Sequence, residues 1–172
     1  GKGGSNLRAY NTGFVWQMRL PQKPRHMRVD AFVQSHDVMP TLLDILGVPY
    51  SRTDGVSVMP LVRGDTESIR NTIVTGWAGF GSGNASAYAS VRTRRWNYIV
   101  PVHAADRGEA LYDLRTDPDE NEDVLSTHPD EAKRLKRYVE AAVGQPLPAQ
   151  LNEVTDRAGS PFATYLGAGR KH

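Results

Sequence analysis

The sequence of 172 residues contains no cysteine. Disulfide bonds, thiolate metal sites and a cysteine nucleophile are therefore excluded within these residues, and the redox compartment stays open. Long apolar runs are missing as well, since no stretch approaches the roughly 18 consecutive apolar residues of a membrane helix. We therefore expect no membrane partner.

A large excess of one charge is also lacking. Lys and Arg total 21 and Asp and Glu total 19, so the formal net charge is only +2. The one tight basic cluster, Arg92, Arg94 and Arg95, falls between two strand-like patterns, and no basic stripe with interleaved aromatic residues accompanies it. We interpret this cluster as a solvated turn and expect no nucleic-acid partner. Hydrophobic residues at 39% and charged residues at 23% are typical of a globular protein.

Two buried strands are predicted near the beginning of the chain. Residues 14–20 are mostly apolar on both faces and end at Pro21, which lacks a donor for a strand ladder. Strands that are apolar on both faces belong inside sheets that are covered on both sides. Residues 29–33 predict a second short strand after a polar connector.

A helix is predicted over residues 37–46. Pro40 is acceptable there only near the first turn, and Gly47 supplies the left-handed residue that ends the helix. The apolar side chains that share one stripe, and are expected to face a core, are Val38, Leu42, Ile45 and Leu46. Residues 59–64 predict a further short helical turn.

The pattern changes after Gly64. Short strands are predicted over residues 72–75, 88–92, 96–100 and 111–114, and the middle two form a hairpin. Because no helix separates these strands, they predict an antiparallel sheet.

A strong helix is predicted over residues 129–143. Ser126 or Thr127 is its candidate cap, and Pro129 with two acidic residues occupies its first turn. Its predicted buried stripe consists of Ala132, Leu135, Val139 and Ala142. From Gly144 the chain is rich in proline, glycine and alanine, and we expect an extended tail.

Four stretches carry the functional information, and three of them precede the predicted antiparallel sheet. Residues 1–5, Gly-Lys-Gly-Gly-Ser, place Lys2 in a loop whose backbone N–H groups can converge on an anion. A Walker A loop is excluded because Gly3 follows the lysine in place of Ser or Thr. A flexible terminus is the alternative. The next two stretches are residues 37–47, Asp-Val-Met-Pro-Thr-Leu-Leu-Asp-Ile-Leu-Gly, and residues 54–61, Asp-Gly-Val-Ser-Val-Met-Pro-Leu.

The fourth stretch is acidic. It covers residues 111–121, Leu-Tyr-Asp-Leu-Arg-Thr-Asp-Pro-Asp-Glu-Asn. A calcium-binding EF-hand loop that opened at Asp117 would need glycine where Glu122 stands and glutamate where His128 stands, so this alternative fails. We interpret the run as a solvated turn after a strand.

Together these stretches resemble the C-terminal part of the sulfatase family, which belongs to the alkaline-phosphatase-like superfamily. Members carry Gly-Lys-Gly, then Asp-(Leu/Ile)-x-Pro-Thr-Leu-Leu-Asp-Leu-x-Gly, then Asp-Gly-x-Ser-Leu, and finally Leu-Tyr-Asp-Leu-x-x-Asp-Pro-x-Glu. Order and spacing match from residue 1 to about residue 143. After Tyr10 the chain departs from the family, which often has Glu and then Arg-Val-Pro. The start of the chain, without a signal peptide or an initiator methionine, also leads us to expect a fragment.

The resemblance implies an α+β fragment of an α/β enzyme. The last strand and helix elements of the large sheet domain would occupy residues 1–65. A small antiparallel sheet packed on a C-terminal helix would occupy residues 66–145, and residues 146–172 would be an extended tail.

The resemblance also implies a reaction, the hydrolysis of a sulfate ester by an arylsulfatase-like, metal-dependent enzyme. A formylglycine attacks sulfur, Ca²⁺ or Mg²⁺ holds the sulfate, and cationic side chains offset charge on the leaving oxygen. Among those groups, Lys2 matches the family lysine that contacts the sulfate. The nucleophile and the metal ligands match no residue here, so we expect no cofactor in this segment and no catalysis by the fragment alone.

Further substrate contacts are weaker predictions. His36 precedes the first helix, and Trp77, Phe80 and His103 lie in segments where the family often builds the rim of its substrate pocket. A phosphodiester or phosphonate monoester hydrolase of the same superfamily, or a non-catalytic binding domain, are the alternatives to a sulfatase. The N-terminal remainder of the enzyme, or a second copy of the chain, is expected to cover an exposed sheet edge.

Overall fold

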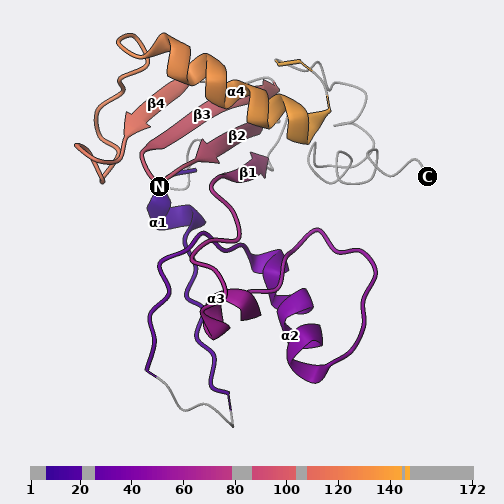
Figure 1. Ribbon diagram of the computed structural model, residues 1–172. Helices are drawn as coiled ribbons and strands as arrows, with labels where there is room; N and C mark the ends of the chain where they lie inside the picture. Colours follow the sequence, from indigo (N-terminus) through magenta and orange to yellow (C-terminus); the bar gives the residue numbers. More distant parts are fainter. Residues whose placement is uncertain (1–6, 21–25, 79–86, 104–107, 145, 148–172) are drawn as a thin grey trace. The chain divides into compact units, whose positions relative to one another are not determined.

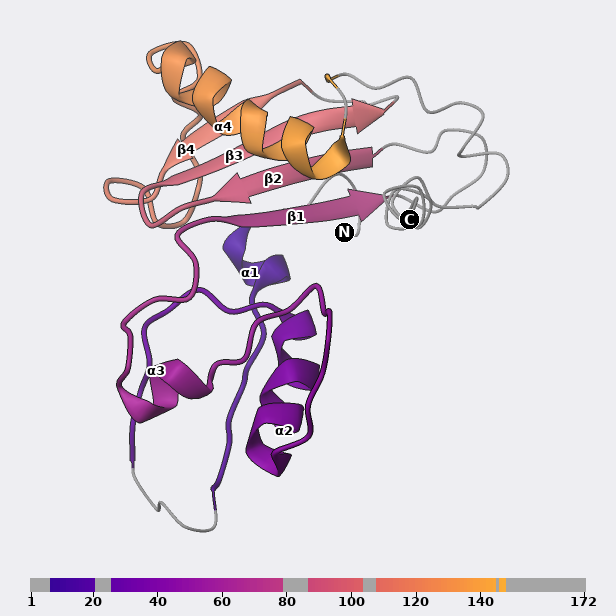
Figure 2. The same cartoon turned by 45° about the vertical axis from the view of Figure 1, so that its right-hand side comes forward.

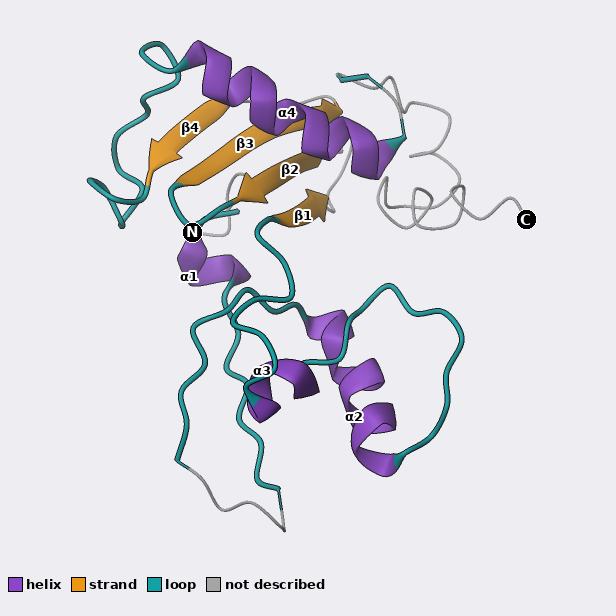
Figure 3. Cartoon of the chain, in the orientation of Figure 1, coloured by secondary structure: helices purple, strands orange, loops and turns teal. Residues whose placement is uncertain are grey.

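The computed structural model describes residues 7–20, 26–78, 87–103, 108–144 and 146–147. Its helices and strands in chain order are α1 (Ala9–Thr12), the 3₁₀ helix η1 (Ser35–Asp37), α2 (Val38–Leu46), α3 (Met59–Arg63), β1 (Ile73–Ala78), β2 (Ala87–Arg92), β3 (Trp96–His103), β4 (Ala110–Asp113) and α4 (Pro129–Val143) (Figures 1 and 3). The chain forms two compact units. The sheet unit joins the residues up to Thr12 to those from Val74 onward, and the helical unit comprises Gly13–Ile73.

The sheet unit contains one four-stranded sheet in the order β1-β2-β3-β4. Strands β2 and β3 pair antiparallel, with Val91 opposite Tyr98, and β3 pairs antiparallel with β4. Figure 2 shows β1 running opposite to its neighbour β2. The predicted antiparallel sheet and its central hairpin are therefore confirmed, and the chain is α+β as expected.

Helix α4 lies across one face of this sheet (Figure 1). Alternate residues of the strands pack against its buried residues Ala132, Leu135 and Val139, as the period of two in a strand requires. The strand residues of this core are Ala89, Val91, Trp96, Tyr98, Val100, Val102 and Leu111. The predicted helix over residues 129–143 is confirmed.

Two details of α4 differ from the prediction. The cap is His128 rather than Ser126 or Thr127, since Thr127 Oγ1 donates to the carbonyl of Val124 and also contacts the His128 ring. Ala142, placed in the buried stripe from its spacing, is exposed, and Val143 packs at the edge of the core instead.

The opposite face of the sheet buries a second, smaller cluster. Tyr88 of β2, Ile99 of β3 and Tyr112 of β4 surround Leu7, which is 3% exposed. Leu7 and α1 thus belong to the sheet unit although the helical unit, Gly13–Ile73, intervenes in the sequence between them and the rest of that unit. The predicted domain boundaries after residues 65 and 145 remain predictions, and the predicted tail beyond residue 147 lies outside the described residues.

The helical unit consists of η1, α2 and α3 joined by extended chain. Gly47 and Gly64 end α2 and α3 in the left-handed region, with φ of 65° and 83°. Both helices and both glycine stops follow the sequence pattern. Pro40 lies in the first turn of α2, where a missing N–H costs no helix bond.

The strands predicted over residues 14–20 and 29–33 are wrong. Neither segment forms a strand, and Val15 is 86% exposed. A strand exists only when its N–H and C=O groups pair with a neighbouring strand. The part of the helical unit that the structure describes offers no such neighbour before Ile73.

The predicted inward stripe of α2 is also wrong. Val38, Leu42 and Ile45 are exposed, and Leu46 is 72% exposed. The buried residues of α2 are Pro40 and Thr41 instead. The periodicity correctly identified an apolar face, but it could not say whether the unit itself covers that face.

Candidate functional site

The predicted site residues lie in different parts of the chain. Lys2 and Phe80 lie outside the described residues. Trp77 lies near the end of β1 and His103 is the last residue of β3, where it pairs with Ala87 at the start of β2. Strands β1 and β3 end at the same end of the sheet (Figure 2), so the fold brings Trp77 and His103 to this end by their backbone positions.

His36 belongs to the helical unit, where it is part of η1. Its side chain is 41% exposed, and Nε2 lies 3.9 Å from Oδ1 of Asp37. The imidazole is thus partly exposed beside a buried carboxylate. The substrate-binding roles of His36, Trp77 and His103 remain predictions.

A buried carboxylate, Glu120, forms the best-defined polar cluster of the sheet unit. Its side chain is only 1% exposed. Oε1 accepts a hydrogen bond from Nη1 of Arg92 at 2.6 Å, and Oε2 accepts one from Nδ2 of Asn97 at 2.8 Å. The strand register places Arg92 directly opposite Asn97, so both donors reach the carboxylate from neighbouring strands. Glu120 therefore crosslinks β2, β3 and the turn after β4.

The same cluster holds the N-terminal residues against the sheet. The backbone N–H of Ala9 donates to Oε1 of Glu120 at 3.3 Å. Nδ2 of Asn97 also donates to the carbonyl of Leu7 at 3.1 Å. Arg8 covers Tyr112, with its guanidinium 5.3 Å from the ring centroid and Nη2 donating to the hydroxyl at 3.4 Å. Residues 7–9 are thus fixed by side chain, backbone and aromatic contacts.

The backbone of Glu120 adopts a conformation that is uncommon for its type. Its φ is 58°, in the left-handed region. Two hydrogen bonds to Asp117 hold the turn. The N–H of Glu120 donates to the carbonyl of Asp117 at 3.1 Å, and the N–H of Glu122 donates to the Asp117 side chain at 2.7 Å. This turn directs the carboxylate of Glu120 inward rather than into solvent. The interpretation of the acidic run in residues 111–121 as a solvated turn is wrong for Glu120, which is buried.

A second buried carboxylate, Asp37, organises the helical unit. It is fully buried, and its two oxygens accept hydrogen bonds from both terminal nitrogens of Arg70, with Nη2 at 2.7 Å from Oδ1. The backbone N–H groups of Gln34 and Val56 also donate to it, at 2.7 Å and 2.9 Å. Burial raises the pKa of Asp37, but the hydrogen bonds from Arg70, Val56 and Gln34 outweigh burial and hold the pKa below 3.8.

The residues around Asp37 show why two motifs occur together. A side chain at Gly55 would place its Cβ 2.1 Å from the carbonyl oxygen of His36, so only glycine fits. Thr41 Oγ1 donates to the carbonyl of Asp37 at 2.6 Å and accepts from the N–H of Val58 at 3.0 Å. Residues 37–47 and 54–61 therefore form one interlocked element.

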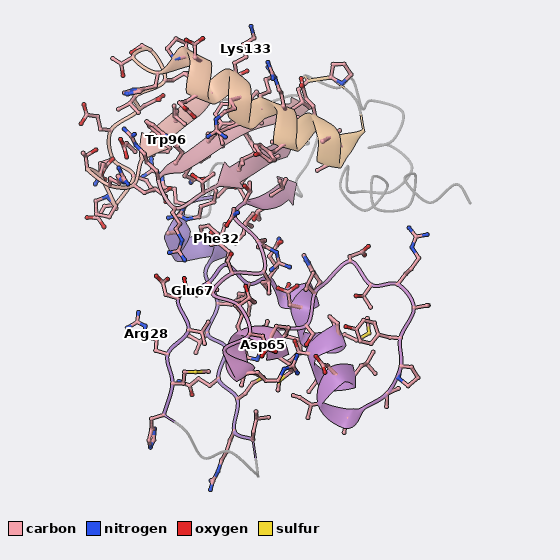
Figure 4. All side chains as sticks on the ribbon, in the orientation of Figure 1. Arg28, Phe32, Asp65, Glu67, Trp96 and Lys133 are labelled. Atoms are coloured by element: carbon pink, nitrogen blue, oxygen red, sulfur yellow. The ribbon has the colours of Figure 1, made fainter. Side chains whose placement is uncertain are left out.

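Two further polar residues of these motifs, Asp44 and Ser57, are bonded to each other. Ser57 Oγ donates to Oδ2 of Asp44 at 2.6 Å, and Arg63 lies 3.8 Å from the other oxygen of Asp44. Arg70 also donates to the carbonyl of Phe32 at 3.3 Å, and Figure 4 labels Phe32 and Asp65 in this unit. The specific motif residues thus stabilise the fold locally.

A third buried carboxylate, Asp113 of the fourth motif, pairs in the sheet with Trp96, which Figure 4 labels. The Arg95 guanidinium, with Nη2 at 2.9 Å, holds the pKa of Asp113 below 3.8. Arg95 also stacks on Trp96 at 4.4 Å from the ring centroid, and His128 lies 5.1 Å from the same ring. The predicted solvated turn is confirmed for Arg94 and Arg95, which are exposed although Arg95 also pairs with Asp113, whereas Arg92 is half-buried and binds Glu120.

On the α4 side, Tyr98 and Glu109 form a further pair. The Tyr98 hydroxyl donates to Oε2 of Glu109 at 2.7 Å, and Nζ of Lys136 lies 2.9 Å from Oε1. Burial, together with the neighbouring Glu109, raises the pKa of Tyr98 above its ordinary value. Burial raises the pKa of Glu109, but the bonds from Lys136 and Tyr98 lower it below 4.5 overall. This pair links α4 to the sheet.

Sequence reasoning missed Glu120, Arg92 and Asn97 as a cluster. The available signal was the last position of the Asp-Pro-x-Glu motif, together with the hairpin register that pairs Arg92 with Asn97. Within the ranges that the structure describes, no three His, Asp or Glu side chains gather as a metal site. No helix in those ranges is long and apolar enough to cross a membrane. The residues described here therefore do not fit a Ca²⁺ or Mg²⁺ site, and we derive no step through a metal ion.

Comparisons with known proteins agree on one group. A family model described as "N-sulphoglucosamine sulphohydrolase, C-terminal" matches residues 10–144. Arylsulfatase K of Bos taurus is 28% identical over 132 residues, and that of Homo sapiens is 30% identical over 131 residues. Each alignment covers 70% of this chain but only 24% of the relative. A solved 2-O GAG sulfatase shares the fold, with a TM-score of 0.50 and 24% identity over 74% of this chain and 26% of that one.

Proposed function

The chain belongs to the sulfatase family, and we propose that it is the C-terminal part of a sulfuric ester hydrolase. It spans about a quarter of the length of the curated relatives that it matches. The complete enzyme's substrate would be a sulfate ester.

One observation carries this proposal: the family match runs through both compact units, from residue 10 to residue 144. It includes residues 37–47, 54–61 and 111–121, which supply the buried, hydrogen-bonded side chains of Asp37, Thr41, Ser57, Asp113 and Glu120. A chance match would not select the groups that hold the fold together. The relatives are sulfatases, which favours a sulfate ester over the phosphodiester or phosphonate alternative.

Lys2 is the residue of this chain that we assign to catalysis. Its ammonium group would contact the sulfate oxygens and would interact more strongly as charge grows on the leaving oxygen, which accelerates the step. The formylglycine and the metal ion that the family uses are assigned to no residue of this chain. They would supply the nucleophile and the electrophilic activation of the sulfate when present. His36, Trp77 and His103 are proposed substrate contacts.

The helical unit indicates how the chain would join the rest of the enzyme. Its exposed apolar side chains are Phe14, Val15, Met18, Met27, Val29, Val38, Met39, Leu42, Ile45, Leu46, Val48, Tyr50 and Val56. An apolar surface of this extent marks an interaction site, because leaving it in water costs free energy in proportion to its area. We propose that the N-terminal remainder of the enzyme covers this surface and an edge of the sheet. A second copy of the chain is the competing occupant.

The test compares the complete enzyme with the isolated 172-residue chain. The complete enzyme, supplied with Ca²⁺ or Mg²⁺, is expected to hydrolyse a chromogenic aryl sulfate faster than the matching aryl phosphodiester. The isolated chain is expected to show no turnover above background, because losing the nucleophile removes many powers of ten in rate. Turnover by the highly purified chain, or a preference of the complete enzyme for the phosphodiester, contradicts the proposal.

A further inference from the structure

We propose that Arg8 and Tyr112 form an anion-binding subsite on the face of the sheet opposite α4. The subsite takes an oxyanion, which is either a second anionic group of the substrate or a carboxylate of the enzyme's N-terminal part. A substrate source rests on the proposed function, whereas the binding of an oxyanion rests on the geometry of the sheet unit, to which both residues belong.

Arg8 differs from the other half-buried arginines that the structure describes. Arg70 and Arg92 are also half-buried, and each of them donates to a buried carboxylate. Arg8 has no carboxylate partner among the described residues, and its side chain donates to the hydroxyl of Tyr112 at 3.4 Å. A guanidinium is always charged and carries five N–H donors, so most donors of Arg8 remain for a further acceptor.

The Tyr112 hydroxyl adds a second kind of donor beside this guanidinium. Tyr112 is 8% exposed, and its oxygen accepts the hydrogen bond from Nη2 of Arg8. A phenol can accept and donate at once, and no residue in the described ranges accepts the Tyr112 proton. The two side chains therefore present N–H and O–H donors next to each other, and such donors bind an oxyanion through charge-assisted hydrogen bonds.

The Arg8 guanidinium is held in place before an anion arrives. Its Cζ atom lies 5.3 Å from the centroid of the Tyr112 ring. The neighbouring backbone is also fixed, because the carbonyl of Leu7 and the N–H of Ala9 are both hydrogen-bonded to buried side chains of the sheet unit. The ring contact uses none of the remaining N–H donors, so they can bind an oxyanion as a bidentate pair. A donor that is already ordered loses little conformational entropy on binding, which favours affinity.

Arg95 provides a matched control within the same unit. Its guanidinium also lies over an aromatic ring, 4.4 Å from the centroid of Trp96. Its donors are occupied, however, since Nε and Nη2 both donate to Oδ2 of Asp113, at 3.1 Å and 2.9 Å. Arg95 should therefore bind no external anion, although it is more exposed than Arg8.

The first measurement requires no enzymatic activity. The 172-residue chain is titrated with sodium sulfate while sodium chloride keeps the ionic strength constant, and NMR follows the arginine Nε–H signals. The Arg8 signal should shift saturably, and the Arg95 signal should not. Followed on the Tyr112 ring signals, Arg8→Gln should weaken sulfate binding by roughly tenfold or more, the effect of losing one hydrogen bond to a charged group. Arg8→Lys should retain part of the affinity, because a compact ammonium cannot bind an oxyanion bidentately.

Tyr112→Phe separates the two donors of the subsite. It removes the hydroxyl and keeps the ring under the guanidinium, so the saturable shift of Arg8 should persist with a lower affinity. Shifts of Arg8 that stay linear in sulfate concentration, or equal saturable shifts of Arg95, would show a general ionic effect and overturn the subsite. Wild-type affinity in Arg8→Gln would do the same. Circular dichroism checks that each variant is folded, and Arg8→Lys, which keeps the charge, carries the test if Arg8→Gln unfolds.

The complete enzyme identifies the source of the anion. If the substrate supplies it, Arg8→Gln should raise KM for an aryl disulfate by roughly tenfold and leave KM for an aryl monosulfate within about twofold, with kcat unchanged. If the N-terminal part supplies a carboxylate, the ratio of the two KM values should stay constant. The complete enzyme, unlike the isolated chain, should then lose thermal stability in Arg8→Gln. An Arg8→Gln enzyme with neither change would overturn the proposal.

Failure of the proposed function would look different. A complete wild-type enzyme that hydrolyses neither aryl sulfate contradicts the proposed function, and the sulfate titration of the 172-residue chain then judges the subsite by itself. Saturable binding at Arg8 in that case would still support the subsite, and its absence would overturn it.

Discussion

The two units of this chain bury their apolar residues in opposite ways. In the sheet unit, α4 and residues 7–9 cover the two faces of one sheet, and its core residues contact each other. Among the described residues, Tyr138 is the exposed large apolar side chain of this unit, while the others run from Phe14 to Val56 in the helical unit. The helical unit is held instead by the polar network around Asp37. The sheet unit thus buries its own apolar side chains, whereas the helical unit is held by buried hydrogen bonds and leaves many apolar side chains exposed.

The largest effect is expected from a charge in the core of the sheet unit. Leu135→Asp buries an unpaired carboxylate against the sheet and should destabilise this unit by more than about 4 kcal/mol. Thermal unfolding followed by circular dichroism measures it. The same change at Leu46, which is exposed in α2, should alter the stability of the isolated chain by at most about 0.5 kcal/mol.

The Leu46 variant also sharpens the comparison between the units. In the complete enzyme, Leu46→Asp should become destabilising, because the proposed cover would then bury the charge. A variant as stable as wild type in both settings would show that the apolar face of α2 is left in water. Equal losses for Leu46→Asp and Leu135→Asp in the isolated chain would show that the faces are assigned wrongly.

The next effect should come from the polar frame of the helical unit. Asp37→Asn leaves Arg70 without its anionic partner, and breaking a buried pair of this kind costs about 3–5 kcal/mol. The Val56 N–H donates to Asp37, so faster hydrogen exchange of this amide would report the weakened network. The control is Asp65→Asn: that carboxylate is 57% exposed beside Arg63, and its loss should cost less than about 1 kcal/mol. Similar effects of the two substitutions would contradict the role given to Asp37.

Acid should weaken both units over a similar range of pH. The pKa values of Asp37 and Asp113 lie below 3.8 in the folded protein, and that of Glu109 lies below 4.5. A carboxyl group whose pKa is lowered by folding stabilises the protein above its ordinary pKa and loses this contribution as the pH falls through the folded value. Stability should therefore be nearly constant from neutral pH to about 4.5 and fall below it. A pH titration of unfolding in which Asp113→Asn shows the same fall as wild type would exclude Asp113 as a contributor.

The smallest effect concerns the last turn of α4. Because Ala142 is exposed, Ala142→Glu should change the free energy of unfolding by no more than about 0.5 kcal/mol. A large loss of stability would show that Ala142 is buried after all, as its spacing in the helix predicts. Chemical denaturation of the isolated chain distinguishes the two results.

Local patterns predicted the sheet unit better than the helical unit. The bounds of α4 and the hairpin of β2 and β3 depend on neighbouring residues, and the sequence shows them directly. In the helical unit the stop at Gly47 was predicted in the same way. The strands predicted over residues 14–20 and 29–33 failed because pairing needs a second strand, and a single segment does not reveal whether one is present.

The candidate site divides in the same manner. The motifs identified the family but not the roles of their residues, since Asp37 and Gly55 proved to be structural. Glu120 was predicted to be solvated because its neighbours in sequence are acidic, yet it binds the N–H of Ala9. The contact between Glu120 and Ala9 crosses 111 positions, which no local pattern reports. The assignments of Lys2, His36, Trp77 and His103 still depend on experiment.

The contact between Glu120 and Ala9 also sets an order of events during synthesis on the ribosome. Residues 7–9 leave the exit tunnel long before their acceptor exists, since 111 positions separate the two partners. At about 5–20 residues per second, translation of that interval takes roughly 6 to 22 seconds. Throughout this interval the first segment of the sheet unit has no carboxylate to bind, and Leu7 has no completed sheet to cover. The nascent chain therefore exposes the apolar side chain of Leu7 until its partners Tyr88, Ile99 and Tyr112 have been synthesised. A chaperone that shields apolar side chains would act on this segment during that period.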